Sequence, residues 1–147
     1  MRYAIAAILA AIIAITASHA RTTDNDYKQV TTLFSGDRTV VGETVHYPSE
    51  GPAKITSVIV TMLPGETTGW HTHGVPLFAY MLEGELQVDY GPKGVRTYKK
   101  GDAFLEAMDV RHDGVNKGPT PARVLAVFMG AEGRKNVVRS ETTTLPR

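Results

Sequence analysis

Turn-forming residues interrupt the chain at short intervals from residue 38 onward. The runs between them are rich in β-branched and aromatic residues, and turns such as SEGP, PGETTG and GPKG recur about every 8 to 12 residues. The strand-like runs span residues 38–47, 53–63, 77–90, 95–100, 103–107 and 122–131. No window has the periodicity of an amphipathic helix. The chain is therefore predicted to be all-β, with a sandwich and a small antiparallel β-barrel as the alternatives.

Residues 1–20 are predicted to be a secretory signal peptide. Arg2 gives the positive start, an apolar run of about 14 residues follows, and Ser18 and Ala20 place small residues at the cleavage positions. The competing interpretation is an uncleaved membrane anchor, but the run is shorter than the roughly 18 to 20 residues that span a bilayer. We therefore expect a mature protein in the periplasm or outside the cell, with no membrane segment after cleavage.

Charge and cysteine content exclude several kinds of partner and site. The 16 basic and 15 acidic residues give a formal net charge of +1, which falls to zero when the predicted signal peptide is removed. This balance gives no electrostatic reason to expect binding to nucleic acid or to an anionic membrane. The chain has no cysteine, so disulfides and thiolate ligands are excluded and any metal must be bound by nitrogen and oxygen.

A chain of 147 residues is expected to form one domain. Residues 21–32 are polar and are predicted to be a flexible lead-in, and residues 33–131 are predicted to form the β domain. Residues 132–147 are a polar C-terminal tail with one short apolar pair, which is either a loose end or a late edge strand.

His71 and His73 are separated by a single residue. In a strand, such alternate side chains point to the same face, with Cα atoms roughly 6.5 Å apart, which suits two imidazoles on one ion. A third histidine, His112, follows a turn, and a neighbouring strand could bring it to the pair. Three neutral imidazoles leave positions open for water or substrate, as in catalytic zinc and non-haem iron sites. The alternative is three unrelated histidines, and the spacing alone does not decide between the two.

Two segments resemble the signature motifs of the cupin superfamily. The first, GETTGWHTHGVPLFAYMLEG, carries the conserved glycines and the histidine pair at the cupin spacing, at Gly65, His71, His73 and Gly84. The second, GDAFLEAMDVRHDGVN, matches at Gly101, His112 and Asn116. The resemblance covers about a hundred residues. It implies a small single-domain cupin, an antiparallel barrel of the double-stranded β-helix or jelly-roll type, and a homodimer is common in that superfamily.

The resemblance also implies a divalent metal bound by His71, His73 and His112, but the fourth cupin ligand is missing. The glutamate of that position is replaced by Leu77, which cannot bind a metal. One interpretation is a three-histidine centre, as in cysteine dioxygenase and the dioxygenase that cleaves acetylacetone. The second is a carboxylate from elsewhere, with Glu106 as the candidate because it lies on the predicted strand leading to His112. The third is a barrel that has lost its metal and only binds a ligand.

The loss of a carboxylate would make the site more positive, which favours anionic ligands. We therefore expect a small, oxygen-rich, chelating metabolite as the ligand or substrate. Iron would suit a dioxygenase, whereas manganese, zinc or nickel would suit an isomerase, a lyase or a hydrolase. Whether the protein is an enzyme stays open, because the alternative is a cupin barrel that binds a small sugar or metabolite without metal.

Four other residues have an expected place near the site. Trp70 and Tyr80 carry a polar atom each and are the aromatic residues most expected to line a pocket. Asn116 either orients His112 or opens the turn that follows it. Arg111 is adjacent to His112 and by alternation should point away from it. In the second motif, Ala107 and Asp109 replace the usual proline and glycine, which affects a turn more than the chemistry.

Overall fold

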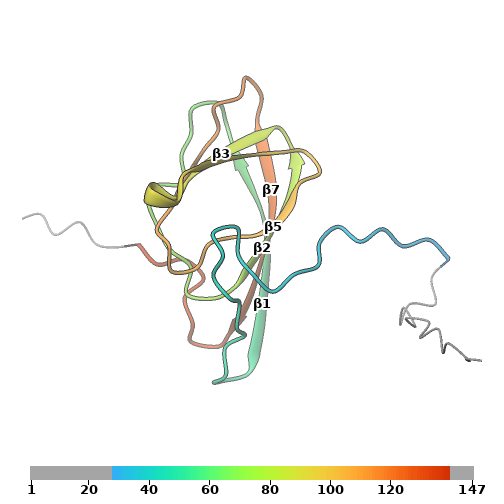
Figure 1. Ribbon diagram of the computed structural model, residues 1–147, viewed down its shortest axis with the longest axis vertical. Coiled ribbons are helices and arrows are strands. Elements are labelled where there is room, and N and C mark those ends of the chain that lie inside the picture. The colour runs from blue at the N-terminus through green and yellow to red at the C-terminus, as the bar shows by residue number, and fades with distance from the viewer. Residues whose placement is uncertain (1–27, 140–147) are drawn as a thin grey trace, which may run out of the picture. The chain divides into compact units, whose positions relative to one another are not determined.

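The structure is a computed structural model that describes residues 28–139 (Figure 1). The predicted signal peptide, residues 21–27 of the lead-in and residues 140–147 of the tail lie outside the described residues. Residues 28–31 belong to a separate N-terminal unit, and the domain begins at Thr32. Within residues 28–139, no helix has the length and apolarity needed to cross a membrane.

The domain consists of two antiparallel sheets, which confirms the all-β prediction. The four-stranded sheet has the order β1-β7-β2-β5 and contains β1 (Ala53–Met62), β7 (Ala122–Ala131), β2 (Leu77–Glu83) and β5 (Ala103–Leu105). The three-stranded sheet has the order β4-β3-β6 and contains β4 (Val95–Lys99), β3 (Glu85–Asp89) and β6 (Asp113–Val115). A 3-10 turn, η1 (Gly91–Lys93), joins β3 to β4. Figure 1 shows β1 and β7 running side by side, in agreement with their ten-residue pairing.

The chain passes from the first sheet to the second at Gly84. The run 77–90 looks continuous in the sequence, yet β2 ends at Glu83 and β3 begins at Glu85. Gly84 has a φ of 70°, and a Cβ there would lie 2.4 Å from the backbone oxygen of Pro121. Glycine alone tolerates both the left-handed backbone and this close approach. The cupin-like glycine therefore marks a change of sheet.

Small side chains on the inner faces of β2 and β7 leave space between the sheets. Burial alternates along both strands, so Leu77 and Ala79 of β2 face inward together with Ala126 and Phe128 of β7. Because Ala79 and Ala126 do not fill the interior, a cavity of about 590 Å³ remains, and residues of both sheets line it. This cavity contains the candidate site.

The C-terminal tail continues the domain past β7. Val138 pairs with Thr72 through two backbone hydrogen bonds of 2.8 and 3.0 Å, in an isolated antiparallel bridge. Of the two alternatives for the tail, a loose end or a late edge strand, residues 136–139 thus form a short edge segment. They cover one side of the loop that carries the histidine pair.

Candidate metal centre

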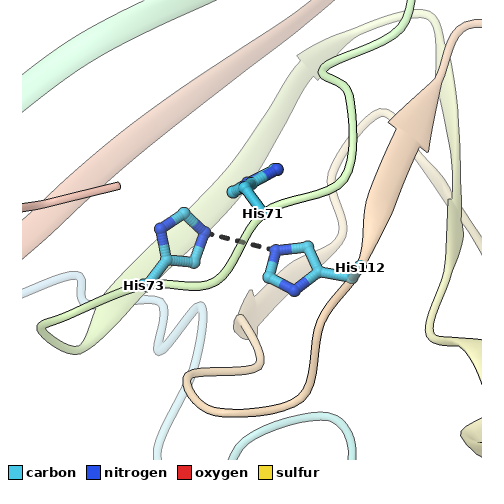
Figure 2. A group of neighbouring side chains, drawn as sticks. All are labelled: His71, His73 and His112. Carbon is cyan, nitrogen blue, oxygen red and sulfur yellow. Dashed lines mark hydrogen bonds between the residues drawn. The ribbon is translucent and has the colours of Figure 1, made fainter. Parts of the chain in front are cut away.

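Three histidine side chains meet in the cavity, as Figure 2 shows. His71 and His73 lie on the extended segment before β2, and His112 immediately precedes β6. Their ligand nitrogens all lie within 4.8 Å of one another. All three side chains are buried, with exposures of 7, 5 and 2%. The structure therefore brings together the three residues that the two motifs contain.

Backbone pairing produces this convergence. The amide of His71 donates to the carbonyl of His112 and the amide of His112 donates to the carbonyl of His71, each at 2.9 Å. The amide of His73 donates to the carbonyl of Met108 at 3.0 Å. The segment that holds the pair is therefore extended, and its alternate side chains at 71 and 73 point to the same face as His112.

A backbone carbonyl orients each of the three rings. The Nδ1 atoms lie 2.7 to 3.0 Å from carbonyl oxygens, His71 from Gly69, His73 from Asn136 and His112 from Val110. Because a carbonyl oxygen only accepts a hydrogen bond, each Nδ1 must carry the ring proton. Each neutral ring therefore presents an unprotonated Nε2, which is the tautomer of a metal ligand held by an outer partner.

The unprotonated nitrogens fit a cation. Nε2 of His73 and Nε2 of His112 are 3.3 Å apart (dashed line in Figure 2), and two lone pairs at this distance repel unless a positive ion lies between them. A proton is disfavoured there, because desolvation by burial lowers the pKa of His71 and His112 and lowers that of His73 to about 3. Three neutral nitrogen donors fit a divalent first-row metal, and they accept several of these ions.

The remainder of the cavity wall is mostly apolar. The apolar lining includes Leu77, Ala79, Leu86, Val88, Phe104 and Phe128. Glu66, Thr68 and Arg139 contribute polar groups to the lining. Nη1 of Arg139 donates to the carbonyl of Thr68 at 2.8 Å, so the C-terminal segment also contributes a charged side chain to the cavity.

Glu106 is a buried carboxyl group in the same cavity. Its side chain is 6% exposed, and its Oε1 accepts hydrogen bonds from the hydroxyl of Tyr90 and the amide of Ala107, each at 2.7 Å. The Tyr90 hydroxyl also lies 3.0 Å from that of Tyr98. Burial raises the pKa of Glu106 to about 7, although both donors act in the opposite direction.

Glu106 does not replace the missing cupin ligand in this conformation. Its carboxylate lies outside the group of ligand atoms that are all within 4.8 Å of one another. The amide of Glu106 donates to the carbonyl of Leu77 at 2.9 Å, so these two residues are neighbours on adjacent segments. Leu77 itself is buried in the cavity wall, at the position where the motif has a ligand.

Trp70 and Tyr80 do not line the cavity, in contrast to the prediction. Tyr80 lies between the buried residues Ala79 and Met81 of β2, so alternation directs its side chain to the opposite face of the sheet. Trp70 is 40% exposed, and its ring lies 5.8 Å from the guanidinium carbon of Arg111. Arg111 is exposed, as expected from alternation next to a buried histidine.

Asn116 has the second of its two predicted roles, that of a turn residue. It is fully buried, but its side-chain amide donates to the carbonyls of Met62 and Thr120, and its Oδ1 accepts from the amide of Gly118. None of these hydrogen bonds involves His112. Asn116 therefore fixes the loop after β6 and does not orient the third imidazole.

Glu43 supports the segment before His112 and was not among the residues predicted from the sequence. Its two carboxylate oxygens accept four hydrogen bonds of 2.8 to 3.0 Å, from the Thr39 hydroxyl and from the amides of Met108, Asp109 and Val110. Burial alone would raise the pKa of Glu43, but these donors lower it below its ordinary value. No motif or spacing connects residue 43 with the second motif, so the sequence contains no signal for this contact.

Comparisons with known proteins agree with the fold. The cupin domain family matches residues 58–128 of the chain. An uncharacterized conserved protein with a double-stranded β-helix domain from Klebsiella pneumoniae is 21% identical, with a TM-score of 0.50 over 65% of this chain and 91% of that chain. This likeness supports the double-stranded β-helix architecture. A search of curated proteins found no match.

Oxalate decarboxylases are also among the similar structures. A tryptophan-to-tyrosine variant of the Bacillus subtilis protein is 25% identical, with a TM-score of 0.50 over 63% of this chain and 26% of that chain. The complex of the Lactobacillus farciminis protein with formate is 24% identical, with a TM-score of 0.48 over 57% of this chain and 26% of that chain. The chain thus spans about a quarter of the length of these proteins.

Proposed function

The chain belongs to the cupin superfamily, and from this premise we propose that it is a metal-dependent cupin whose divalent ion is held by His71, His73 and His112. The observation that supports this most strongly is the common tautomer of the three rings. Each Nδ1 proton is donated to a backbone carbonyl, so each ring keeps an unprotonated nitrogen, and the ligand nitrogens of the three rings lie within 4.8 Å of one another in the cavity. Such a donor set is matched to a divalent cation.

The proposed ligand is a small molecule with chelating oxygen atoms and an apolar remainder. A divalent ion at this site would supply Lewis acidity toward an oxygen ligand, and three neutral nitrogens would leave its charge available for an anionic oxygen. The apolar wall, with Phe104 and Phe128, would exclude water and pack against the carbon skeleton. A small 2-oxo acid or β-diketone has both features. The likeness to an oxalate decarboxylase agrees with a small chelating acid.

The apolar wall disfavours the alternative of a metal-free sugar-binding barrel. A sugar needs hydrogen-bond partners around most of its surface. Apart from the histidines and Glu106, the polar side chains of the described lining are Thr61, Glu66, Thr67, Thr68 and Arg139, and the rest of the lining is apolar. A bound cation would in addition relieve the repulsion between the facing Nε2 lone pairs of His73 and His112, which are 3.3 Å apart.

We also propose that the mature protein is exported after removal of residues 1–20. Support comes from the sequence alone, from the charged start at Arg2, the apolar run and the small residues before Arg21. N-terminal sequencing of the protein produced in its natural host is expected to begin at Arg21. An intact N-terminus would contradict the proposal.

Metal analysis of the purified mature protein tests the metal site. We expect about one divalent ion per chain in the wild type and less than about 0.2 in His71→Ala and His112→Ala, since two imidazoles cannot retain an ion that three hold. His46→Ala is the matched control, because His46 is exposed and lies outside the histidine group. Less than about 0.2 ions in the wild type after reloading with iron, manganese, zinc and nickel would favour the metal-free alternative.

A further inference from the structure

The two oxygens of Glu106 have different surroundings. The hydroxyl of Tyr90 and the amide of Ala107 both donate to Oε1. Oε2 takes part in none of the hydrogen bonds described for residues 28–139. Within this range, no fully buried side-chain oxygen or nitrogen lacks a partner, so Oε2 is the oxygen that remains accessible from the cavity. The carboxyl group is therefore held by one oxygen and open at the other.

The backbone of Glu106 places this free oxygen in the histidine cavity. Its amide is bonded to the carbonyl of Leu77, in continuation of the β2–β5 pairing of Ala79 with Phe104. By alternation, Phe104 and Glu106 face the same side, and both line the cavity that the three imidazoles share. Glu106 is also near enough to His71 for the two groups to influence each other's pKa, so a ligand held at the histidines would lie near Oε2.

We propose that Glu106 exchanges a proton between Oε2 and the ligand held at the histidine group, as the general base and general acid of the site and not as a fourth metal ligand. The inference rests on the proposed function, because the ligand must be held at His71, His73 and His112. Glu106 thereby becomes the candidate catalytic residue of a proton-transfer reaction, such as an isomerisation or an elimination.

The proposed step is balanced without an external reactant. The ligand loses the proton of an O–H bond, or of a C–H bond next to a carbonyl group, and the bonding electron pair stays on the ligand as an alkoxide or enolate. The proton forms a new bond to Oε2. Since Oε1 keeps its hydrogen bonds to Tyr90 and Ala107, the new O–H group points into the cavity and can return the proton to another atom of the ligand.

The groups around Glu106 keep it able to act in both directions. Burial, its largest influence, raises the pKa to about 7, the donors Tyr90 and Ala107 and nearby His71 lower it, and Glu43 raises it. A carboxyl group with a pKa near neutrality serves as base and as acid at physiological pH.

Two further groups face this network from β4. The pKa of Tyr98 is raised to about 12, and that of Tyr90 is raised above its ordinary value, mainly by burial, so both stay protonated as donors. The guanidinium carbon of Arg96 lies 6.0 Å from the centre of the Tyr90 ring.

Proton release on binding of acetohydroxamic acid to the zinc-loaded protein tests the inference without an enzymatic assay. This probe chelates through two oxygens and loses its hydroxyl proton. At pH 8 the wild type should retain that proton on Glu106, so calorimetry in buffers of different ionisation enthalpy should show little release. In Glu106→Gln, about one proton per bound probe should pass to the buffer. Equal release by the two proteins would overturn the inference.

Control variants separate this inference from the metal site and from a general effect of carboxylates. Glu66→Gln removes another carboxylate of the lining and should behave like the wild type. Tyr90→Phe removes a donor that lowers the pKa of Glu106, so more of the carboxyl is already protonated at pH 8 and release should be intermediate.

Zinc affinity provides the remaining distinction. It should change by less than about 3-fold in Glu106→Gln if Glu106 is not a ligand, and a loss of more than about 10-fold would overturn that part of the inference. Failure of the wild type to bind zinc would instead contradict the proposed function.

Discussion

Glu43 and Glu106 flank the short segment that leads to His112, and they differ both in burial, which is partial for Glu43 and nearly complete for Glu106, and in their hydrogen bonds. Both are removed from water to some extent, but Glu43 accepts four hydrogen bonds through its two oxygens, whereas Glu106 accepts two, both through Oε1. The pKa of Glu43 is lowered and that of Glu106 is raised to about 7. Deep burial with two donors therefore raises the pKa of Glu106, whereas partial burial with four donors lowers that of Glu43.

The difference in hydrogen bonding also gives the two carboxyl groups different roles, structural for Glu43 and open to a ligand for Glu106. Three of the donors to Glu43 are consecutive backbone amides, at residues 108–110, so the carboxylate fixes the segment that presents the third imidazole. Oε2 of Glu106 holds no part of the backbone in place, because it accepts none of the described hydrogen bonds and is open to the cavity. The same substitution, glutamate to glutamine, should therefore have effects of opposite sign at the two positions.

The largest effect is expected for Glu106→Gln in the metal-free protein. A group whose pKa is higher in the folded than in the unfolded protein stabilises the fold when the pH is below its unfolded-state pKa. This stabilisation is lost as the pH rises through its folded-state pKa. For Glu106 this window runs from 4.5 to about 7. Above it, the variant should be more stable to urea unfolding than the wild type by about 3 kcal/mol, with little difference near pH 4. If the variant and the wild type differ in unfolding free energy by the same amount at pH 4 and pH 8, the pKa of Glu106 is not raised in the folded protein and the contrast with Glu43 is wrong.

Glu43→Gln should have the second largest effect, in the opposite direction. The neutral amide oxygen cannot satisfy four donors, so the free energy of unfolding at pH 7 should fall by about 2 kcal/mol. The folded-state pKa of Glu43 is lowered, so this contribution is present above the unfolded value and is lost as the pH falls through the folded value. Denaturant unfolding at pH 7 and pH 3 measures it. Glu50→Gln is the control, since its exposed ion pair with Arg134 should contribute less than about 0.5 kcal/mol.

Tyr98→Phe should have the smallest effect and would sharpen the comparison. It removes a hydroxyl that contacts Tyr90 but not Glu106, and it keeps the ring stacked on Phe104 at a centroid distance of 3.7 Å. A loss of about 1 kcal/mol in the free energy of unfolding is expected, because Tyr90 keeps its bond to Glu106. A loss above about 3 kcal/mol would mean that Tyr98 is needed to hold the carboxyl group, contrary to the two-donor description.

Short-range regularities made the histidine group predictable. His71 and His73 share a face because of the two-residue repeat of an extended chain, and Gly65, Gly84, Gly101 and His112 fall at the spacing of a known superfamily. Two of the three carbonyls that orient the rings, those of Gly69 and Val110, lie two residues before the histidine they contact. Contacts of this kind follow from local backbone geometry.

Contacts between distant parts of the chain could not be predicted in the same way. The carbonyl of Asn136 lies 63 residues from His73, and Glu43 lies 65 residues or more from the amides it binds. Neither contact has a sequence pattern, since any residue supplies a carbonyl and many surface positions carry a glutamate. The hydroxyl group of Tyr80 suggests a pocket residue, but the alternation that buries Ala79 and Met81 directs its side chain to the opposite face of the sheet.

The three imidazoles take their orientation from main-chain oxygens, which every amino acid carries. Side chains of the wall such as Leu86 and Val88 can therefore be exchanged in a descendant or a designed variant while the rings keep their directions. A protein built in this way can acquire a new ligand preference by altering its walls, one residue at a time, without rebuilding the histidine group.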